Sequence, residues 1–226
     1  MKIVIATIKS WNIERAKELA SLYNCLIITS KDELTKENLQ SYVPEYIFFP
    51  HWSWIIPEEI YSNFNCVVFH MTDLPFGRGG SPLQNLIVRR IKHTKISAIK
   101  VEKGIDTGPV YMKKDLCIEG SAEEVLRRAS SVVFSLIKDI IVSRPVPVPQ
   151  AGEVVCFQRR TSAQSELPMS ASIEEILSFI RMLDGEGYPL AFINYGNIKI
   201  TFSRAAIKDG DILADARIEL IKGNIL

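Results

Sequence analysis

The chain has 226 residues, of which 47% are hydrophobic and 23% charged, and its formal net charge at pH 7 is +1. A chain of this size buries a substantial core and suits one α/β domain with a smaller appendage. The near-neutral charge and the lack of strongly basic stripes predict that nucleic acid is not a partner.

The sequence also predicts a cytoplasmic protein with no membrane contact. Met1 and Lys2 lead directly into an apolar stretch that is typical of a first strand and not of a signal peptide, and no apolar run is long enough to span a bilayer. The cysteines are widely spaced and lie mostly in apolar runs, which favours buried free thiols in a reducing compartment over disulfides or a metal site. They are Cys25, Cys66, Cys117 and Cys156.

Strand and helix signals alternate through the first half of the chain. Apolar runs predict strands at residues 2–6, 25–28, 46–49 and 66–69, and helical spacing predicts helices at 12–23 and 35–42. Asn12 is expected to cap the first helix. This order predicts a Rossmann-like, mostly parallel sheet with helices on both faces. The first strand–helix loop contains no glycine, which argues against a dinucleotide site.

A polar and aromatic segment follows the strand at residues 46–49. It contains His51, Trp52, Ser53, Trp54 and Ile55. Two tryptophans at a strand end suit a flat aromatic ligand, although tryptophans in an apolar row are also common in cores. In a parallel sheet, His51 would face the same crevice as the end of the next strand. Its alternative roles are a simple substrate contact or a turn cap.

The strand at residues 66–69 ends in His70, and a loop rich in glycine and proline follows. Open α/β sheets bind ligands at the carboxyl ends of their strands, where an imidazole can transfer protons near neutral pH. The alternative is a strand-end histidine that only satisfies a hydrogen bond. The same loop presents Arg78, Gly79 and Gly80.

A second loop places Asp106 between Gly104-Ile105 and Gly108, 36 residues after His70. This spacing suits one strand–helix–strand crossover, made by a helix at 83–91 and a strand at 96–101. His93 is expected on the charged surface of that helix. An Asp-Thr-Gly segment also forms local Asx-turns, so a purely structural role for the carboxylate stays open.

The second half of the chain predicts a strand at 110–118, a helix at 121–142 and then a proline-rich connector at 145–149. We therefore divide the chain into residues 1–145 and a linker with a small C-terminal α+β piece at 146–226. That piece contains a predicted helix at 172–183 and strands at 198–202 and 215–221. Before the helix, Arg159 and Arg160 suit a phosphate or carboxylate, or are surface charge.

Several of these segments together resemble one known family. His70, Leu74-Pro75, Arg78-Gly79 and Pro82, followed by Asp106-Thr107-Gly108, resemble the formyltransferases that use 10-formyltetrahydrofolate. This family contains methionyl-tRNA formyltransferase and the sugar N-formyltransferases. The catalytic asparagine of the family pattern falls on Val68 in this chain.

The resemblance implies roles for the residues already introduced. His70 and Asp106 would be catalytic, and residues 1–145 would form the catalytic domain. The formyl donor would be held by Trp52, Ser53, Trp54, Ile55, Gly104 and Ile105. The acceptor would be held by Arg78, Gly79, Gly80, Arg159 and Arg160. No metal is implied.

The chemistry of formyl transfer makes the substitution at Val68 important. An acceptor amine attacks the formyl carbon, His70 takes the proton that the amine loses, and Asp106 orients the imidazole; such help gives roughly 10²–10⁴-fold in rate. A donor to the negative oxygen is worth about 3 kcal/mol. With valine at position 68, that donor would be His51, a backbone N–H or protonated His70.

The identity of the acceptor is a separate prediction. The neutral charge, the short C-terminal piece and the Arg159-Arg160 pair favour a small-molecule amino sugar of a nonulosonic, pseudaminic-type pathway of surface glycan biosynthesis. Two alternatives stay open, a formyltetrahydrofolate hydrolase and a non-catalytic binding relative. A homodimer also stays open.

Overall fold

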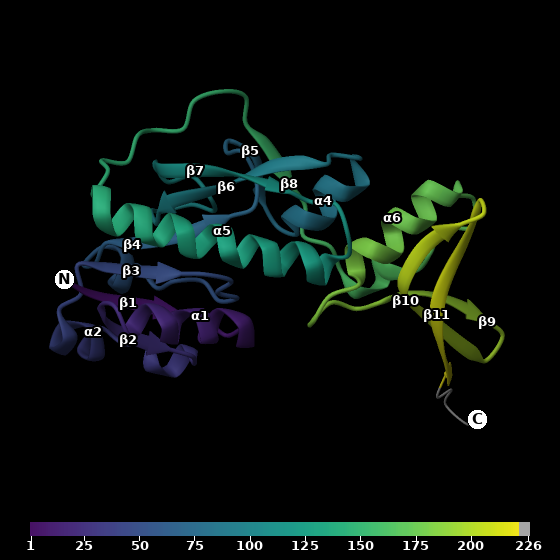
Figure 1. The fold of residues 1–226 in the computed structure, drawn as a ribbon, viewed down its shortest axis with the longest axis horizontal. Helices are drawn as coiled ribbons and strands as arrows, with labels where there is room; N and C mark the ends of the chain where they lie inside the picture. Colours follow the sequence, from purple (N-terminus) through teal and green to yellow (C-terminus); the bar gives the residue numbers. More distant parts are fainter. Residues whose placement is uncertain (222–226) are drawn as a thin grey trace. The chain divides into compact units, whose positions relative to one another are not determined.

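The computed structural model describes residues 1–221, which form two compact units that are each discontinuous in sequence (Figure 1). Unit 1 contains residues 1–79, 94–116 and 127–156, and unit 2 contains residues 80–93, 117–126 and 157 onward. The chain therefore passes between the units several times. The domain boundary after residue 145 stays a prediction, because these compact units do not divide the chain at one point.

Unit 1 is built on a six-stranded sheet with the order β2-β1-β3-β4-β6-β7. The strands are β1 (Lys2–Ala6), β2 (Asn24–Ile28), β3 (Tyr46–Phe49), β4 (Cys66–His70), β6 (His93–Lys100) and β7 (Val110–Cys117). Strands β2, β1, β3 and β4 pair in parallel, which confirms the predicted fold class. The strand after β4 departs from the prediction, because β6 pairs with β4 in the antiparallel sense and no parallel crossover joins them.

The apolar strands form the centre of this sheet because both of their faces are covered. Ile3, Val4 and Ile5 of β1 are fully buried, and so are Ile47 and Phe48 of β3. Strands buried on both faces read as continuous apolar runs, which is why they were predictable. One face packs on α2 (Lys36–Tyr42) and α3 (Glu58–Tyr61), through residues such as Leu39 and Ile60. Figure 1 shows α5 (Ala122–Ser143) running along the strands.

Two helix boundaries differ from the prediction. Helix α1 spans Ser10–Ala20 with Lys9 at its N-cap, so Asn12 lies inside the helix, where its side chain is fully buried. Helix α4 ends at Val88, and Arg90 takes a left-handed conformation (φ 59°) that stops the helix. His93 is therefore the exposed first residue of β6 and not a helix residue.

A short strand pair was not predicted. Strand β5 (Phe76–Gly79), in the loop after His70, pairs with β8 (Val155–Phe157). The Val155 amide donates to the carbonyl oxygen of Pro75 at 3.4 Å. Gly77 and Gly79 in the first strand hid it, because glycine is rare in strands.

Unit 2 has a three-stranded antiparallel sheet of β9 (Ala191–Tyr195), β10 (Ile198–Lys208) and β11 (Asp211–Leu220), in the order β11-β10-β9. Helix α6 (Ile173–Leu183) packs on β10, and helix α4 (Pro82–Val88) packs on α6. The side chains of Ser172 and Glu175 form a capping box at the start of α6. Short 3₁₀ helices occur at Lys31–Glu33 and Ser162–Ser165.

Residues 1–221 contain no helix that is both long and apolar enough to cross a membrane. The same residues contain no cluster of three or more His, Cys, Asp or Glu side chains able to hold a metal ion.

Candidate active site

The structure brings His70 and Asp106 together within unit 1. His70 is the last residue of β4 and is 7% exposed. Its Nδ1 atom lies 3.3 Å from Oδ2 of Asp106, and its Nε2 atom lies 2.7 Å from the carbonyl oxygen of Gly77. The predicted proximity of these two side chains is therefore observed.

Asp106 does more than close its own turn. Its backbone is left-handed (φ 54°), and its Oδ2 atom accepts a hydrogen bond from the Gly79 amide at 2.9 Å. The carboxylate thus joins its own loop to the glycine-rich loop after His70. A local Asx-turn alone does not account for these contacts.

Gln150 holds the two loops in this arrangement. Its Nε2 atom donates to the carbonyl oxygens of Asp106 and Gly108, at 2.8 Å each. Its Oε1 atom accepts from Nε and Nη2 of Arg78, at 3.1 and 2.8 Å. The sequence analysis missed Gln150, because a lone glutamine after a proline-rich connector has no signature.

The hydrogen bonds of His70 limit what its ring can do. A carbonyl oxygen only accepts, so Nε2 carries a proton and donates it to Gly77. On the other side, Nδ1 lies 3.3 Å from Oδ2 of Asp106, which is also an acceptor. The ring takes a proton from an amine at Nε2 only after its bond to Gly77 is broken and its hydrogen has moved to Nδ1, where Asp106 accepts it.

A pocket of about 290 Å³ lies beside this pair, which is close to the ~300 Å³ lower bound of small-molecule sites. Val68 of β4 and Ile99 of β6 contribute apolar walls, and residues 100–108 contribute a loop. Asp106 itself is part of the lining. The pocket thus offers apolar walls and backbone polar groups next to a titratable pair.

Four of the six residues predicted to hold the formyl donor line this pocket, namely Trp54, Ile55, Gly104 and Ile105. Ile55 and Ile105 are 93% and 72% exposed, which is unusual for isoleucine and suits contact with a ligand. The other two, Trp52 and Ser53, are not in the lining. Trp52 packs against Phe49 and Trp54, with ring centroids 5.9 and 4.8 Å apart.

Val68 lies where the family pattern has asparagine, and it is half-buried in the pocket wall. Its side chain has no hydrogen-bond donor. Val68 and His70 are two residues apart on one strand, so both point to the same face of the sheet. The site therefore has an apolar group where the family pattern predicts an amide.

His51 contacts Asn12 and does not line the pocket. Its Nδ1 atom lies 3.0 Å from Nδ2 of Asn12, and its backbone is left-handed (φ 52°). Burial, with a smaller effect of nearby Lys9, lowers the pKa of His51 to about 4. The imidazole is therefore neutral at physiological pH.

The residues predicted to hold the acceptor are divided between the two units. The guanidinium of Arg78 bonds to Gln150, and Gly79 bonds to Asp106, both in unit 1. Gly80, Arg159 and Arg160 belong to unit 2.

Within unit 2, Arg160 is partly enclosed whereas Arg159 is exposed. The Arg160 guanidinium lies 5.4 Å from the ring centroid of Phe179 and donates to the carbonyl oxygen of Gln164. A Cβ added to Gly80 would lie 2.5 Å from Cβ of Arg159, so glycine is needed there for close packing. Gly80 thus has a structural role.

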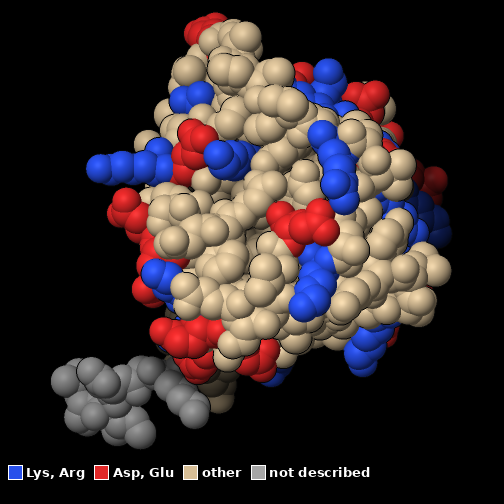
Figure 2. Space-filling view, turned by 90° about the vertical axis from the view of Figure 1, so that its left-hand side faces the viewer, with Lys and Arg blue, Asp and Glu red and all other residues tan. Residues whose placement is uncertain are grey.

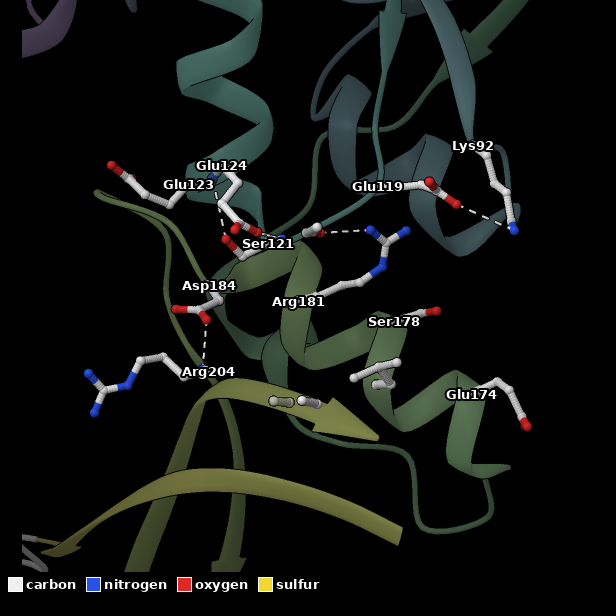
Figure 3. A pocket seen from close by; sticks show the side chains of 14 residues that line it. Lys92, Glu119, Ser121, Glu123, Glu124, Glu174, Ser178, Arg181, Asp184 and Arg204 are labelled. Carbon is white, nitrogen blue, oxygen red and sulfur yellow. Dashed lines mark hydrogen bonds and ion pairs between the residues drawn. The ribbon is translucent and has the colours of Figure 1, made fainter. Parts of the chain in front are cut away.

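Unit 2 also has a larger hollow of about 920 Å³, lined by charged side chains (Figure 3). Those charges already have partners. Arg181 donates to the carbonyl oxygens of Ile118 and Gly120, and Lys92 lies 3.4 Å from Glu119. Glu124 accepts from the Ser121 amide at the start of α5. The hollow therefore reflects helix capping and ion pairing.

Basic and acidic side chains are interspersed on the face of the molecule shown in Figure 2. No broad basic stripe covers that face, in keeping with the net charge of +1.

Comparison with known proteins finds relatives that cover most of the chain. Residues 162–219 match the family model of the methionyl-tRNA formyltransferase C-terminal domain. A solved structure, methionyl-tRNA formyltransferase from Clostridium thermocellum, is 59% identical, covers 97% of this chain and 99% of its own, and superposes with a TM-score of 0.95.

Curated relatives are more distant. Methionyl-tRNA formyltransferase of Thermodesulfovibrio yellowstonii is 25% identical over 205 residues, which are 85% of this chain and 66% of the relative. The enzyme of Clostridium perfringens is 25% identical over 199 residues, which are 84% of this chain and 63% of the relative. The chain thus spans somewhat less than two thirds of these relatives.

A sugar N-formyltransferase from Shewanella shares the fold at 15% identity, with a TM-score of 0.68 and coverage of 95% of this chain and 96% of its own. At this identity the likeness concerns the fold alone.

These relatives overturn two predictions. The amino-sugar acceptor of a nonulosonic, pseudaminic-type glycan pathway is wrong, because the relative that is 59% identical is a methionyl-tRNA formyltransferase. The expected absence of a nucleic-acid partner is wrong as well, since the relatives are named for a tRNA substrate. Net charge was a poor guide because it averages over the whole surface and does not describe any one binding site.

Proposed function

We propose that this chain, a member of the formyltransferase family that contains methionyl-tRNA formyltransferase, formylates methionyl-tRNA. The formyl group would pass from 10-formyltetrahydrofolate to the amine of the methionyl group. The observation that carries the proposal is the 59% identity to a methionyl-tRNA formyltransferase over 99% of that protein's chain. The paired His70 and Asp106 beside an apolar pocket support it independently. A cytoplasmic location is part of the proposal.

The residues around the pocket fit a flat heteroaromatic ring. Val68 and Ile99 offer one apolar wall, and Trp54, Ile55 and Ile105 offer exposed apolar surface around the opening. The Nε1 atom of Trp52, whose ring touches Trp54, is buried without a hydrogen-bond partner. Apolar walls with a few polar groups are typical of cofactor pockets. Bound there, the folate would supply an electrophilic formyl carbon.

His70 and Asp106 are the proposed proton-transfer pair. Once the His70 bond to Gly77 opens and the ring hydrogen lies on Nδ1, where Asp106 accepts it, Nε2 can take a proton from the acceptor amine. Asp106 is itself fixed by the Gly79 amide, which keeps the carboxylate in line with the imidazole. A positioned base of this kind contributes roughly 10²–10⁴-fold.

The test is formylation of methionyl-tRNA by the purified full chain, with 10-formyltetrahydrofolate as donor and formyl-methionine on the tRNA as the product measured. Free methionine and uncharged tRNA serve as controls. Among these three acceptors, we expect only methionyl-tRNA to give product. We expect the rate to fall at least roughly 100-fold in His70→Ala and in Asp106→Ala. His93→Ala is the matched control, since His93 is an exposed histidine that does not line the pocket.

Folate turnover that is independent of any amine would refute the transferase and identify a hydrolase. Folate binding without turnover would identify a non-catalytic relative.

A further inference from the structure

Three polar residues far apart in sequence meet in a buried chain of hydrogen bonds in unit 1. Asn12 of α1 and Ser130 of α5 are both fully buried. The Ser130 hydroxyl donates to Oδ1 of Asn12 at 2.6 Å, and Nδ2 of Asn12 lies 3.0 Å from Nδ1 of His51. Neither Asn12 nor Ser130 has a role in the site described so far.

The surroundings of Asn12 decide which way its amide points. Nδ2 also lies 3.5 Å from the carbonyl oxygen of Pro50, which only accepts hydrogen bonds. On the other side, the Ser130 hydroxyl donates to Oδ1 and so fixes that atom as an oxygen. Nδ2 therefore donates to Nδ1 of His51, and a neutral imidazole in this position must carry its hydrogen on Nε2.

His51 itself bears the marks of a constrained functional residue. Its φ of 52° is a left-handed conformation that non-glycine residues rarely adopt and that costs about 1–3 kcal/mol. Burial lowers the pKa of His51 to about 4, and the facing charged group is Lys9. The result is an imidazole that is held neutral and offers one N–H donor, as in enzymes that polarise a carbonyl with neutral histidine.

The sheet register places His51 at the same edge as the reaction. Phe49 of β3 pairs with Val68 of β4 in a parallel ladder. His51 lies in the turn two residues after Phe49, the last residue of β3, and His70 is the last residue of β4. Both imidazoles therefore leave the carboxyl edge of adjacent strands, where open α/β sheets bind substrates.

We propose that His51 supplies the hydrogen-bond donor that Val68 lacks, and that Asn12 and Ser130 are positioning residues which fix its tautomer. This inference rests on the proposed function. As the amine nitrogen bonds to the formyl carbon, the π electron pair moves to the formyl oxygen, which accepts from Nε2–H of His51. The pair returns as the bond from carbon to the tetrahydrofolate nitrogen breaks, and that nitrogen receives the proton that the amine loses.

Two replacements of His51 separate its inner and outer nitrogens. In His51→Asn, Oδ1 takes the place of Nδ1 and keeps the bond to Asn12, and asparagine tolerates a positive φ, but the outer donor is lost. In His51→Gln, the amide nitrogen reaches the place of Nε2 and keeps a donor. We expect kcat to fall about 100-fold in the first variant and less than about 10-fold in the second, with the KM for folate unchanged in both.

A substitution at Val68 tests whether a donor on β4 can replace the donor that His51 supplies. Val68→Asn restores the amide of the family pattern, so we expect it to raise kcat of His51→Asn by at least about 10-fold. It should not rescue His70→Ala, which lacks the proton-transfer group. His93→Ala controls for the loss of a histidine as such. Wild-type kcat in His51→Asn, or no rescue by Val68→Asn, overturns the proposal.

The tautomer can be measured without any activity. Long-range ¹H–¹⁵N spectra of the full chain report which ring nitrogen carries hydrogen. We expect neutral His51 with its hydrogen on Nε2 at pH 7. In Asn12→Asp, where a carboxylate oxygen faces Nδ1, we expect this tautomer to be lost. Hydrogen on Nδ1 in the wild type overturns the positioning role. Wild-type formylation of methionyl-tRNA then still stands, so failure of this inference is distinct from failure of the proposed function.

Discussion

His51 makes the stability of the protein depend on pH in a way that one substitution isolates. The pKa of His51 is lowered from 6.5 to about 4 in the folded chain, so the unfolded chain binds this proton more readily. Stability therefore rises with pH between about 4 and 6.5, and is lost as pH falls through that window. His51→Asn removes the titrating group and keeps an acceptor for Asn12.

The size of the effect follows from the pKa change. Each pKa unit is worth 1.36 kcal/mol, so the fall from 6.5 to about 4 corresponds to about 3 kcal/mol of folding free energy. Wild type should lose about that much more than His51→Asn between pH 7 and pH 4. All other titrating groups, His70 included, are common to both proteins and cancel in the difference.

Urea unfolding followed by tryptophan fluorescence at pH 7, 6, 5 and 4 measures both proteins under matched conditions. The free energies come from linear extrapolation, with comparable m-values as the check that the unfolded states are alike. Curves of free energy against pH that run parallel for the two proteins would refute the assignment of His51 as buried and neutral.

Three further predictions concern the loop that carries Asp106. Gly108→Ala places a Cβ 1.8 Å from the carbonyl oxygen of Lys100, so we expect a loss of more than about 3 kcal/mol in thermal unfolding. Gly210→Ala meets no atom within 4 Å and should cost only about 1 kcal/mol; equal losses would contradict the steric argument. Asp106→Asn should lower kcat at least about 100-fold with little change in Tm, and an unchanged kcat would remove the carboxylate from the mechanism. Gln150→Ala frees the loop, so KM for folate should rise several-fold while kcat changes less, and an unchanged KM would show that the loop holds itself.

The sequence was informative where hydrophobic burial sets the structure. Apolar runs such as residues 46–49 and 66–69 placed β3 and β4, and the polar residue that ends a buried run located His70. The carboxylate partner followed from its glycine-flanked loop. These features depend on short segments, each of which carries its own pattern.

The sequence was uninformative where contacts join distant segments. The antiparallel entry of β6 is decided by pairing with β4, and a single strand's pattern does not encode the direction of its neighbour. Asn12 was predicted as a cap because its type suits one, yet it is buried by contact with Ser130, 118 residues away. The acceptor was mispredicted because bulk charge does not describe the charge at any one binding site.

Under the proposed role of His51, valine at position 68 does not by itself imply an inactive relative, because the same oxygen has a donor that follows the adjacent strand. Parallel strands end at one edge, so a donor lost from β4 can be replaced from β3 without moving the reaction. The replacement has a cost, since His51 needs a left-handed backbone and Asn12 needs Ser130 to satisfy its buried amide. Buried polar groups with such specific partners are expensive to maintain by chance. Their presence after β3, the strand whose Phe49 pairs with Val68, is the strongest reason to test His51, Val68 and Asn12 as one unit.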